Sequence, residues 1–225
     1  MIIKEQKSSS YPPADGKNLK PPDRVLLCVP RWDETAALSA GAKYDLHEGF
    51  YAHSDDFLDP LWAWLPRRWR APPALLPEML PADTWEQNLR TALPADRWDT
   101  LRRAVYSNAG YRCEICGQKG EPHLEAHEAW SFDDTWCVQT LTGLLSLCPT
   151  CHKCHHLGLA RRLGLYERCL QKMEQVNDWT PAQVRQSIAA AADQAQERSR
   201  YAWHVDLSWL ESGRYYLDYR LSGSR

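Results

Sequence analysis

Four cysteines constrain the fold of this chain of 225 residues more than any other feature. They form two Cys-x2-Cys pairs that lie 31 residues apart: Cys113, Cys116, Cys148 and Cys151. Each pair places two sulfurs on one edge of a tetrahedron, as a single Zn²⁺ ion requires. The spacing therefore predicts a structural zinc site that joins two distant segments. Cys154 forms another such pair with Cys151 and is a competing ligand, and His155 is a weaker competitor.

The composition is that of an ordinary globular protein, with 44% hydrophobic and 25% charged residues. A formal net charge of −2 argues against a uniformly basic surface, so nucleic-acid binding would need a local patch. The sequence has no signal peptide and no apolar run long enough to span a membrane. We therefore predict a cytoplasmic protein whose cysteines are reduced. Cys28, Cys137 and Cys169 have no paired spacing and are expected to be buried apolar side chains.

Proline and polar residues divide the chain into four predicted segments. Residues 1–22 are polar and broken by proline, which is typical of a flexible leader. Residues 23–66 are expected to form a small α+β module. Residues 67–83 are rich in proline and arginine and predict a semi-rigid linker. Residues 84–225 form the larger predicted domain, with C-terminal helices and a strand.

The small module resembles a domain of unknown function found in some plasmid-transfer primases and other DNA-processing proteins. The similarity consists of Val29-Pro30 at a strand end, residues 40–45 at a helix end and Phe50-Tyr51 in a strand. The alternative is a small packing module that carries no site.

The cysteine pairs enclose motifs that resemble the HNH nuclease family. The first is Leu124-Glu125-Ala126-His127-Glu128, and the second runs from Leu147 to His156 as Leu-Cys-x2-Cys-His-x3-His. Residues 127–134 and 203–210 also resemble segments of a bacterial subgroup of that family. The resemblance implies an α+β fold: a zinc-stabilised ββα-metal (HNH) core with helical flanks, preceded by the small α+β module.

The resemblance also implies a second, catalytic metal held by His127, His152 and His156. His152 and His156 are four residues apart, so on a helix both rings leave the same face. Imidazole favours Mn²⁺, Ni²⁺ or Zn²⁺ over Mg²⁺, which is also possible in a cell. The expected activity is metal-dependent hydrolysis of phosphodiester bonds in DNA. Alternatively, His152 and His156 are surface residues or additional zinc ligands.

Two positions depart from the family pattern. Glu128 stands where the family has a second histidine, its general base, and Gly143 stands where it has an asparagine; Gln139 is the nearest amide. A carboxylate with a reference pKa of about 4.3 is a weaker base than imidazole. The catalytic residues implied are Glu128, His127 and His152. The alternative function is a catalytically weak or inactive zinc-dependent protein that binds nucleic acid or serves as an adaptor.

Other charged residues near the motifs are candidate ligands for metal or phosphate. Asp133 and Asp134 are either oxygen ligands or ordinary loop acids. Five arginines are candidates for phosphate contacts: Arg103, Arg112, Arg161, Arg162 and Arg168.

Overall fold

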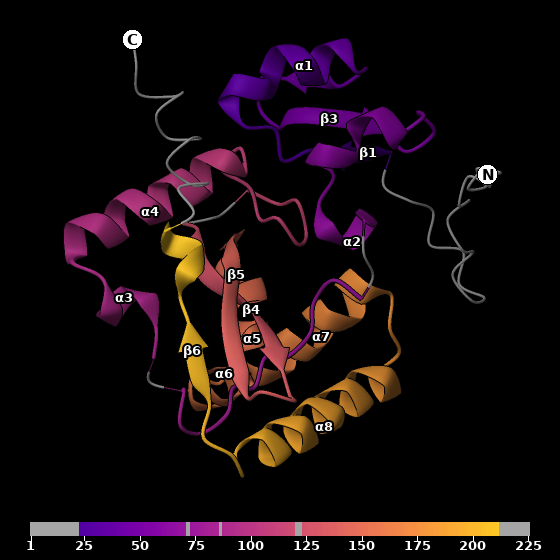
Figure 1. The fold of residues 1–225 in the computed structure, drawn as a ribbon. Helices are drawn as coiled ribbons and strands as arrows, with labels where there is room; N and C mark the ends of the chain where they lie inside the picture. The colour runs from indigo at the N-terminus through magenta and orange to yellow at the C-terminus, as the bar shows by residue number, and fades with distance from the viewer. Residues whose placement is uncertain (1–22, 71–72, 86, 120–122, 212–225) are drawn as a thin grey trace, which may run out of the picture.

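The computed structural model describes residues 23–70, 73–85, 87–119 and 123–211. It confirms the α+β class, with two separate three-stranded sheets and helices around them (Figure 1). The predicted leader, residues 1–22, lies outside the described residues. Among the described helices, none combines the length and apolarity that crossing a bilayer requires.

The N-terminal module, residues 23–66, is built on a small antiparallel sheet. Its elements are β1 (Arg24–Leu26), the 3₁₀-helix η1 (Arg31–Asp33), α1 (Glu34–Ser39), β2 (Lys43–Asp45), β3 (Gly49–His53) and the 3₁₀-helix η2 (Asp59–Trp64). The strand order is β1-β3-β2. Alternate residues of β3, Phe50 and Ala52, are buried in a core that includes Val25 and Leu61.

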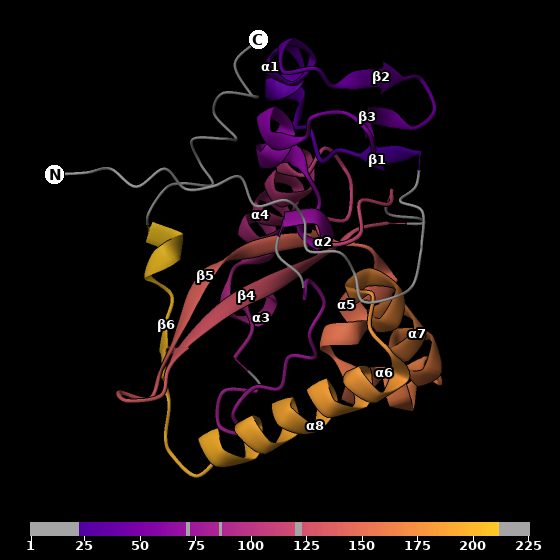
Figure 2. The same ribbon diagram turned by 90° about the vertical axis from the view of Figure 1, so that its right-hand side faces the viewer.

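The remaining residues form a second sheet with helices on both sides. These elements are α2 (Arg67–Arg70), α3 (Leu89–Ala92), α4 (Ala95–Asn108), β4 (Glu125–Asp133), β5 (Val138–Leu147), α5 (Pro149–His155), α6 (Leu157–Arg162), α7 (Tyr166–Asn177), α8 (Pro181–Arg198), β6 (His204–Asp206) and the 3₁₀-helix η3 (Ser208–Glu211). Strands β4 and β5 form a long antiparallel hairpin, and β6 pairs with β5 in parallel (Figure 2). The hairpin leads directly into α5.

The hairpin has two covered faces. On one face Leu144 packs with Leu89 and Leu101, which belong to α3 and α4. On the other face Leu145 and Leu147 pack in the core formed with α5 and α7. Successive residues of a strand point to opposite faces, so neighbours in β4 are directed into different environments.

The predicted linker is packed against the second sheet's helices. Leu75 is fully buried in the core, and the side-chain amide of Asn177 accepts from its N–H at 2.9 Å and donates to its C=O at 2.7 Å. Farther along, the N–H of Glu78 donates to the carbonyl of His155 at 3.1 Å. Burying one leucine contributes about 1.5–3 kcal/mol. These contacts hold the proline-rich segment against α5 and α7.

The N-terminal module docks on the loop that carries the first cysteine pair, residues 112–119, here termed the first knuckle. Within the module, the thiol of Cys28 donates to the carbonyl of Cys113 at 3.8 Å. Directly after the module, in α2, the N–H groups of Arg67 and Arg68 donate to the carbonyls of Glu114 and Ile115 at 2.6 and 3.2 Å. Gly110 lies just before this loop and adopts φ +58°. A Cβ at this position would lie 2.3 Å from the carbonyl oxygen of Val29.

We expect Gly110→Ala to destabilise the protein by at least about 1–3 kcal/mol, because the change combines left-handed backbone strain with a clash against fixed backbone. Gly158→Ala is the matched control. Gly158 lies in α6, and no atom of the described part of the chain lies within 4 Å of an added Cβ, so that variant should be neutral or stabilising by up to about 1 kcal/mol. Chemical denaturation measures the stability of both variants, and equal stability would contradict the close contact between Gly110 and the Val29 carbonyl.

Candidate metal centres

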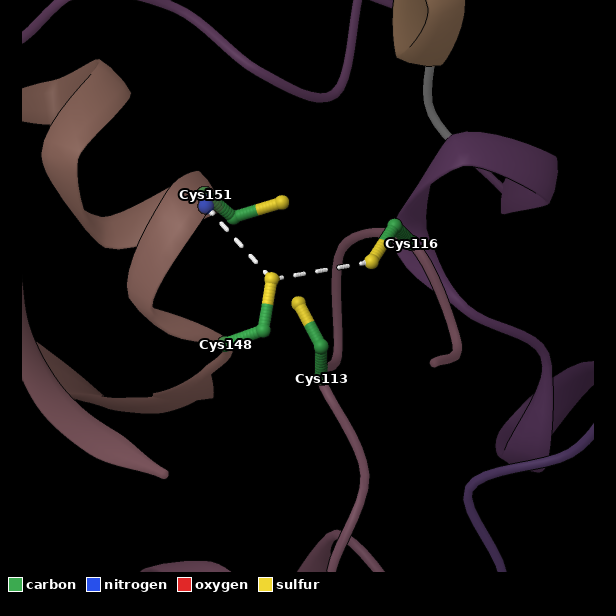
Figure 3. Close-up of side chains that lie close together, drawn as sticks. All are labelled: Cys113, Cys116, Cys148 and Cys151. Atoms are coloured by element: carbon green, nitrogen blue, oxygen red, sulfur yellow. Dashed lines mark hydrogen bonds between the residues drawn. The ribbon is translucent and has the colours of Figure 1, made fainter. Parts of the chain in front are cut away.

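The four cysteine side chains converge between the first knuckle and the start of α5 (Figure 3). Their sulfurs all lie within 4.8 Å of one another, and those of Cys116 and Cys148 are 3.9 Å apart. Four sulfurs at about 2.3 Å from one Zn²⁺ ion would be about 3.8 Å apart. All four side chains are buried. The group can therefore hold a structural metal ion such as zinc.

Local backbone geometry orients the two sulfurs of each cysteine pair. In the first knuckle the N–H of Gly117 donates to the carbonyl of Cys113 at 2.8 Å, and Gly117 adopts φ +78°, which glycine tolerates best. In the second pair Cys148 caps α5, its sulfur accepting from the N–H of Cys151 at 3.5 Å. Pro149 occupies the first turn of α5, where its missing N–H costs nothing.

A buried hydrogen-bonded pair joins the first knuckle to the end of the hairpin. The N–H of Glu114 donates to the carbonyl of Ser146 at 2.9 Å, and the N–H of Ser146 donates to the Glu114 carboxylate at 2.6 Å. Burial raises the pKa of Glu114, and the Ser146 N–H opposes that rise. This pairing aligns the two cysteine pairs.

Contacts between the thiols shift the pKa values of Cys113 and Cys116 in opposite directions. The hydrogen bond from Cys113 lowers the pKa of Cys116, and the same bond raises the pKa of Cys113. Burial opposes the charge of Lys172, but nearby thiolates raise its pKa overall. A bound metal needs every sulfur deprotonated, so we expect zinc affinity to fall as the pH decreases.

The other cysteines lie outside this cluster. Cys154, the competing ligand considered above, donates instead to the carbonyls of Thr150 at 3.1 Å and Cys169 at 3.5 Å. Cys28 and Cys169 are buried, as predicted, whereas Cys137 is only half-buried at the hairpin turn. Burial raises the pKa of Cys28 to about 12.

Three histidines form a second candidate centre beside the hairpin. His127 comes from β4, His152 from α5, and His156 from the residue after α5. One ring nitrogen of each lies within 4.8 Å of the others, and the Nε2 atoms of His152 and His156 are 3.2 Å apart. His127 is buried and the other two are half-buried. Such a group can accept a divalent ion.

Two carboxylates contact these imidazoles from the side. Glu125 forms a short hydrogen bond with Nδ1 of His152 and accepts from Lys153 Nζ at 2.8 Å. This leaves Nε2 of His152 directed toward His156. Glu78, from the proline-rich segment, lies with Oε2 3.1 Å from Nε2 of His127. Carboxylates in this position orient imidazole ligands and raise their basicity.

Burial keeps part of this centre neutral. It lowers the pKa of His156 to about 3, with the neighbouring imidazoles adding to the effect. Burial also lowers the pKa of His155, whose ring stacks on His127 with centroids 4.3 Å apart. Burial opposes the charge of Glu125, but its hydrogen bonds lower its pKa to about 2. Neutral imidazole with a lone pair is the form that binds metal.

Glu128 and the other candidates have partners elsewhere. Glu128 pairs with Leu144 across the hairpin, and its carboxylate accepts from the N–H of Leu89 at the start of α3, at 3.1 Å. Gln139 is buried and its Oε1 accepts from the hydroxyl of Thr84 at 2.7 Å. Gly143 lies in β5 opposite Ala129. The catalytic role of Glu128 thus stays a prediction.

The two aspartates have structural partners. Asp133 accepts from the N–H groups of Thr135 and Trp136 at 2.9 and 3.1 Å, so it caps the hairpin turn. Asp134 forms two hydrogen bonds with Arg198, at 2.7 and 3.0 Å. These contacts favour the interpretation of both as loop acids.

Neither Glu78 nor Glu125 was predicted from the sequence to have a role in the site. Glu125 lies two residues before His127 on one strand, so strand periodicity was a signal that both face α5. Glu78 had no such signal, because its position depends on contacts between the proline-rich segment and α5. No protein-family model, curated protein or solved structure matches this chain.

We expect Cys116→Ser to lose the zinc ion that resists mild chelation, and to melt at a lower temperature than wild type, because one sulfur ligand is removed. Cys137→Ser is the control, since Cys137 lies outside the cluster. Elemental analysis after chelation measures the retained zinc. Full zinc retention by Cys116→Ser would contradict the assignment of this cluster.

Proposed function

We propose that the protein is a metal-dependent endonuclease of the HNH type that hydrolyses DNA. The observation that carries the proposal is the convergence of His127, His152 and His156 at the junction of a β-hairpin and the following helix. A strand–strand–helix unit with a metal at its centre is the core that the HNH resemblance implies. The neighbouring cysteine cluster fits the accompanying structural zinc.

The chain's own residues supply binding and orientation. His127, His152 and His156 would hold a divalent cation, which supplies positive charge to a scissile phosphate and to the leaving oxygen. Glu125 fixes the ring of His152 through Nδ1. His155 stacks on His127 and covers one face of that ring.

Two carboxylates are candidates to accept the proton of the attacking water. Glu128 occupies the family's base position, but its carboxylate caps α3 on the hairpin face that carries Leu144. Glu78 lies against His127, on the face that carries the three imidazoles. We propose that Glu78 takes the proton, because a base must lie within hydrogen-bond reach of the water that it activates.

The second candidate function is zinc-dependent binding of nucleic acid without turnover. This alternative is favoured by the hydrogen bond that the Glu128 carboxylate accepts from the N–H of Leu89. Glu128 stands where the family has its general base, but here its carboxylate caps α3. Under this alternative the three imidazoles would hold a metal that only positions a phosphate.

We expect His152→Ala to lower plasmid nicking in Mn²⁺ by at least about 100-fold, because it removes a cation ligand. Zinc retained after mild chelation should be unchanged, since His152 is not a ligand of the cysteine cluster. His204→Ala, an exposed change on β6, is the control and should cleave like wild type. Undiminished nicking by His152→Ala would exclude the proposed metal site.

We expect Glu78→Gln to lower nicking by about 100-fold or more, the typical contribution of a general base. Glu128→Gln should have a smaller effect, because the glutamine carbonyl can still accept from Leu89 N–H. Nicking rates of the two variants, measured at equal protein and Mn²⁺ concentrations, show whether Glu78 or Glu128 is the general base. The reverse order would identify Glu128 as the base, and inert wild-type protein that shifts DNA in a gel would favour the binding function.

A further inference from the structure

A cavity of about 560 Å³ lies where the N-terminal module meets the first knuckle. Its walls come from α1, β2 and β3 of the module and from residues 107–119 beyond it. Volumes of this size accommodate small organic ligands. The cavity shares no residue with either candidate metal centre.

Aromatic rings line the cavity from both sides of this junction. Tyr44 is 55% exposed and stands 5.0 Å from the ring of buried Phe50, while Tyr111 is 64% exposed. Tyr111 also adopts φ +56°, an unusual conformation for a bulky residue. Exposed tyrosine rings provide surfaces on which a flat heteroaromatic group can stack.

The floor of the cavity includes a buried guanidinium that lacks a full set of acceptors. Arg112 is only 4% exposed; its Nη1 donates to the carbonyl of Gly117 at 3.1 Å, but its Nη2 has no hydrogen-bond partner among the described residues. Gly49 packs close to this nitrogen, since a Cβ there would lie 3.0 Å from Nη2. A buried charge without an acceptor is costly, and an anion would relieve that cost.

The rim adds to the positive charge. Arg31 and Lys119 are exposed and line the cavity, and Glu34 is the acidic residue among its described lining. Lys119 also donates to the carbonyl of His47, which holds its side chain over the module. With Arg112, three cations face one carboxylate, so the cavity favours a ligand of negative charge.

We propose that this cavity binds a nucleoside phosphate, with its base on the tyrosine rings and its phosphate directed toward Arg112 and Arg31. A bare anion would use the cations and leave the rings without a role. The same chemistry comes from two sources: a free mononucleotide, or the phosphorylated end of a nucleic-acid strand. The proposal does not depend on the endonuclease activity, because no metal-centre residue lines the cavity.

The test uses the full zinc-loaded chain in isothermal titration calorimetry. The probes are AMP, adenosine, inorganic phosphate, phosphotyrosine and a short 5′-phosphorylated oligodeoxythymidine. AMP or the oligonucleotide should bind at least about tenfold more tightly than adenosine or phosphate, because each fragment makes only part of the contacts. Tighter binding of AMP than of the oligonucleotide identifies a free nucleotide, and the opposite order identifies a strand end.

Variants locate the binding. Tyr44→Ala and Arg31→Ala should each weaken binding of the tighter of the two nucleotide probes, AMP or the oligonucleotide, by at least about fivefold. The first variant loses one stacked ring and the second loses one phosphate contact. Arg185→Ala is the matched control: Arg185 is exposed on α8 and does not line the cavity. His152→Ala should bind the nucleotide probes with wild-type affinity, because His152 does not line the cavity. The binding result can therefore be interpreted even if the nuclease proposal fails. Zinc content and melting temperature establish that each variant is folded.

Several results would overturn the proposal. These are the absence of binding by both nucleotide probes, phosphate or phosphotyrosine binding as tightly as AMP, or wild-type affinity in both Tyr44→Ala and Arg31→Ala.

Discussion

The convergence of four thiols is the constraint on which the rest of the structure depends. It joins the first knuckle to the end of β5 and the start of α5, segments about thirty residues apart in sequence. The N-terminal module then docks on the backbone of that knuckle through Cys28, and α2, which follows the module, bonds to Glu114 and Ile115. Structural zinc contributes about 10–16 kcal/mol to folding in small domains, which exceeds the net stability of many proteins. Metal occupancy is therefore expected to govern the arrangement of the whole chain.

The cysteine cluster also determines where the histidines lie. Cys148 caps α5, so the helix begins at a fixed residue and His152 follows one turn later on a fixed face. Pairing of β4 with β5 aligns His127 with Leu145, two residues before the strand ends at Leu147. The same backbone that positions sulfurs therefore brings an imidazole from the strand to the imidazoles of the helix. The two centres are linked through α5.

The sequence was informative wherever spacing alone determines geometry. Two Cys-x2-Cys pairs predicted the sulfur cluster. The four-residue separation of His152 and His156 predicted two neighbouring rings on a helix; the rings are close together, although His156 is the residue after α5. It was uninformative where a role depends on tertiary packing. The bond between Glu128 and Leu89 depends on where α3 lies, and the approach of Glu78 to His127 depends on a proline-rich segment whose path no periodicity encodes. The α+β class was implied by the HNH resemblance, whereas the packing of that segment was not predicted.

The packing of the proline-rich segment gives it a role beyond spacing. Asn177 of α7 holds the backbone of Leu75, and three residues later Glu78 reaches His127. Proline limits the conformations available before folding, so ordering this stretch costs less entropy than ordering a flexible chain. The proline-rich segment can therefore hold the Glu78 carboxylate close to the imidazoles, although Glu78 belongs to neither the hairpin nor α5. The segment between the two sheets is thus part of the candidate centre, and the N-terminal module is attached to it through the same backbone.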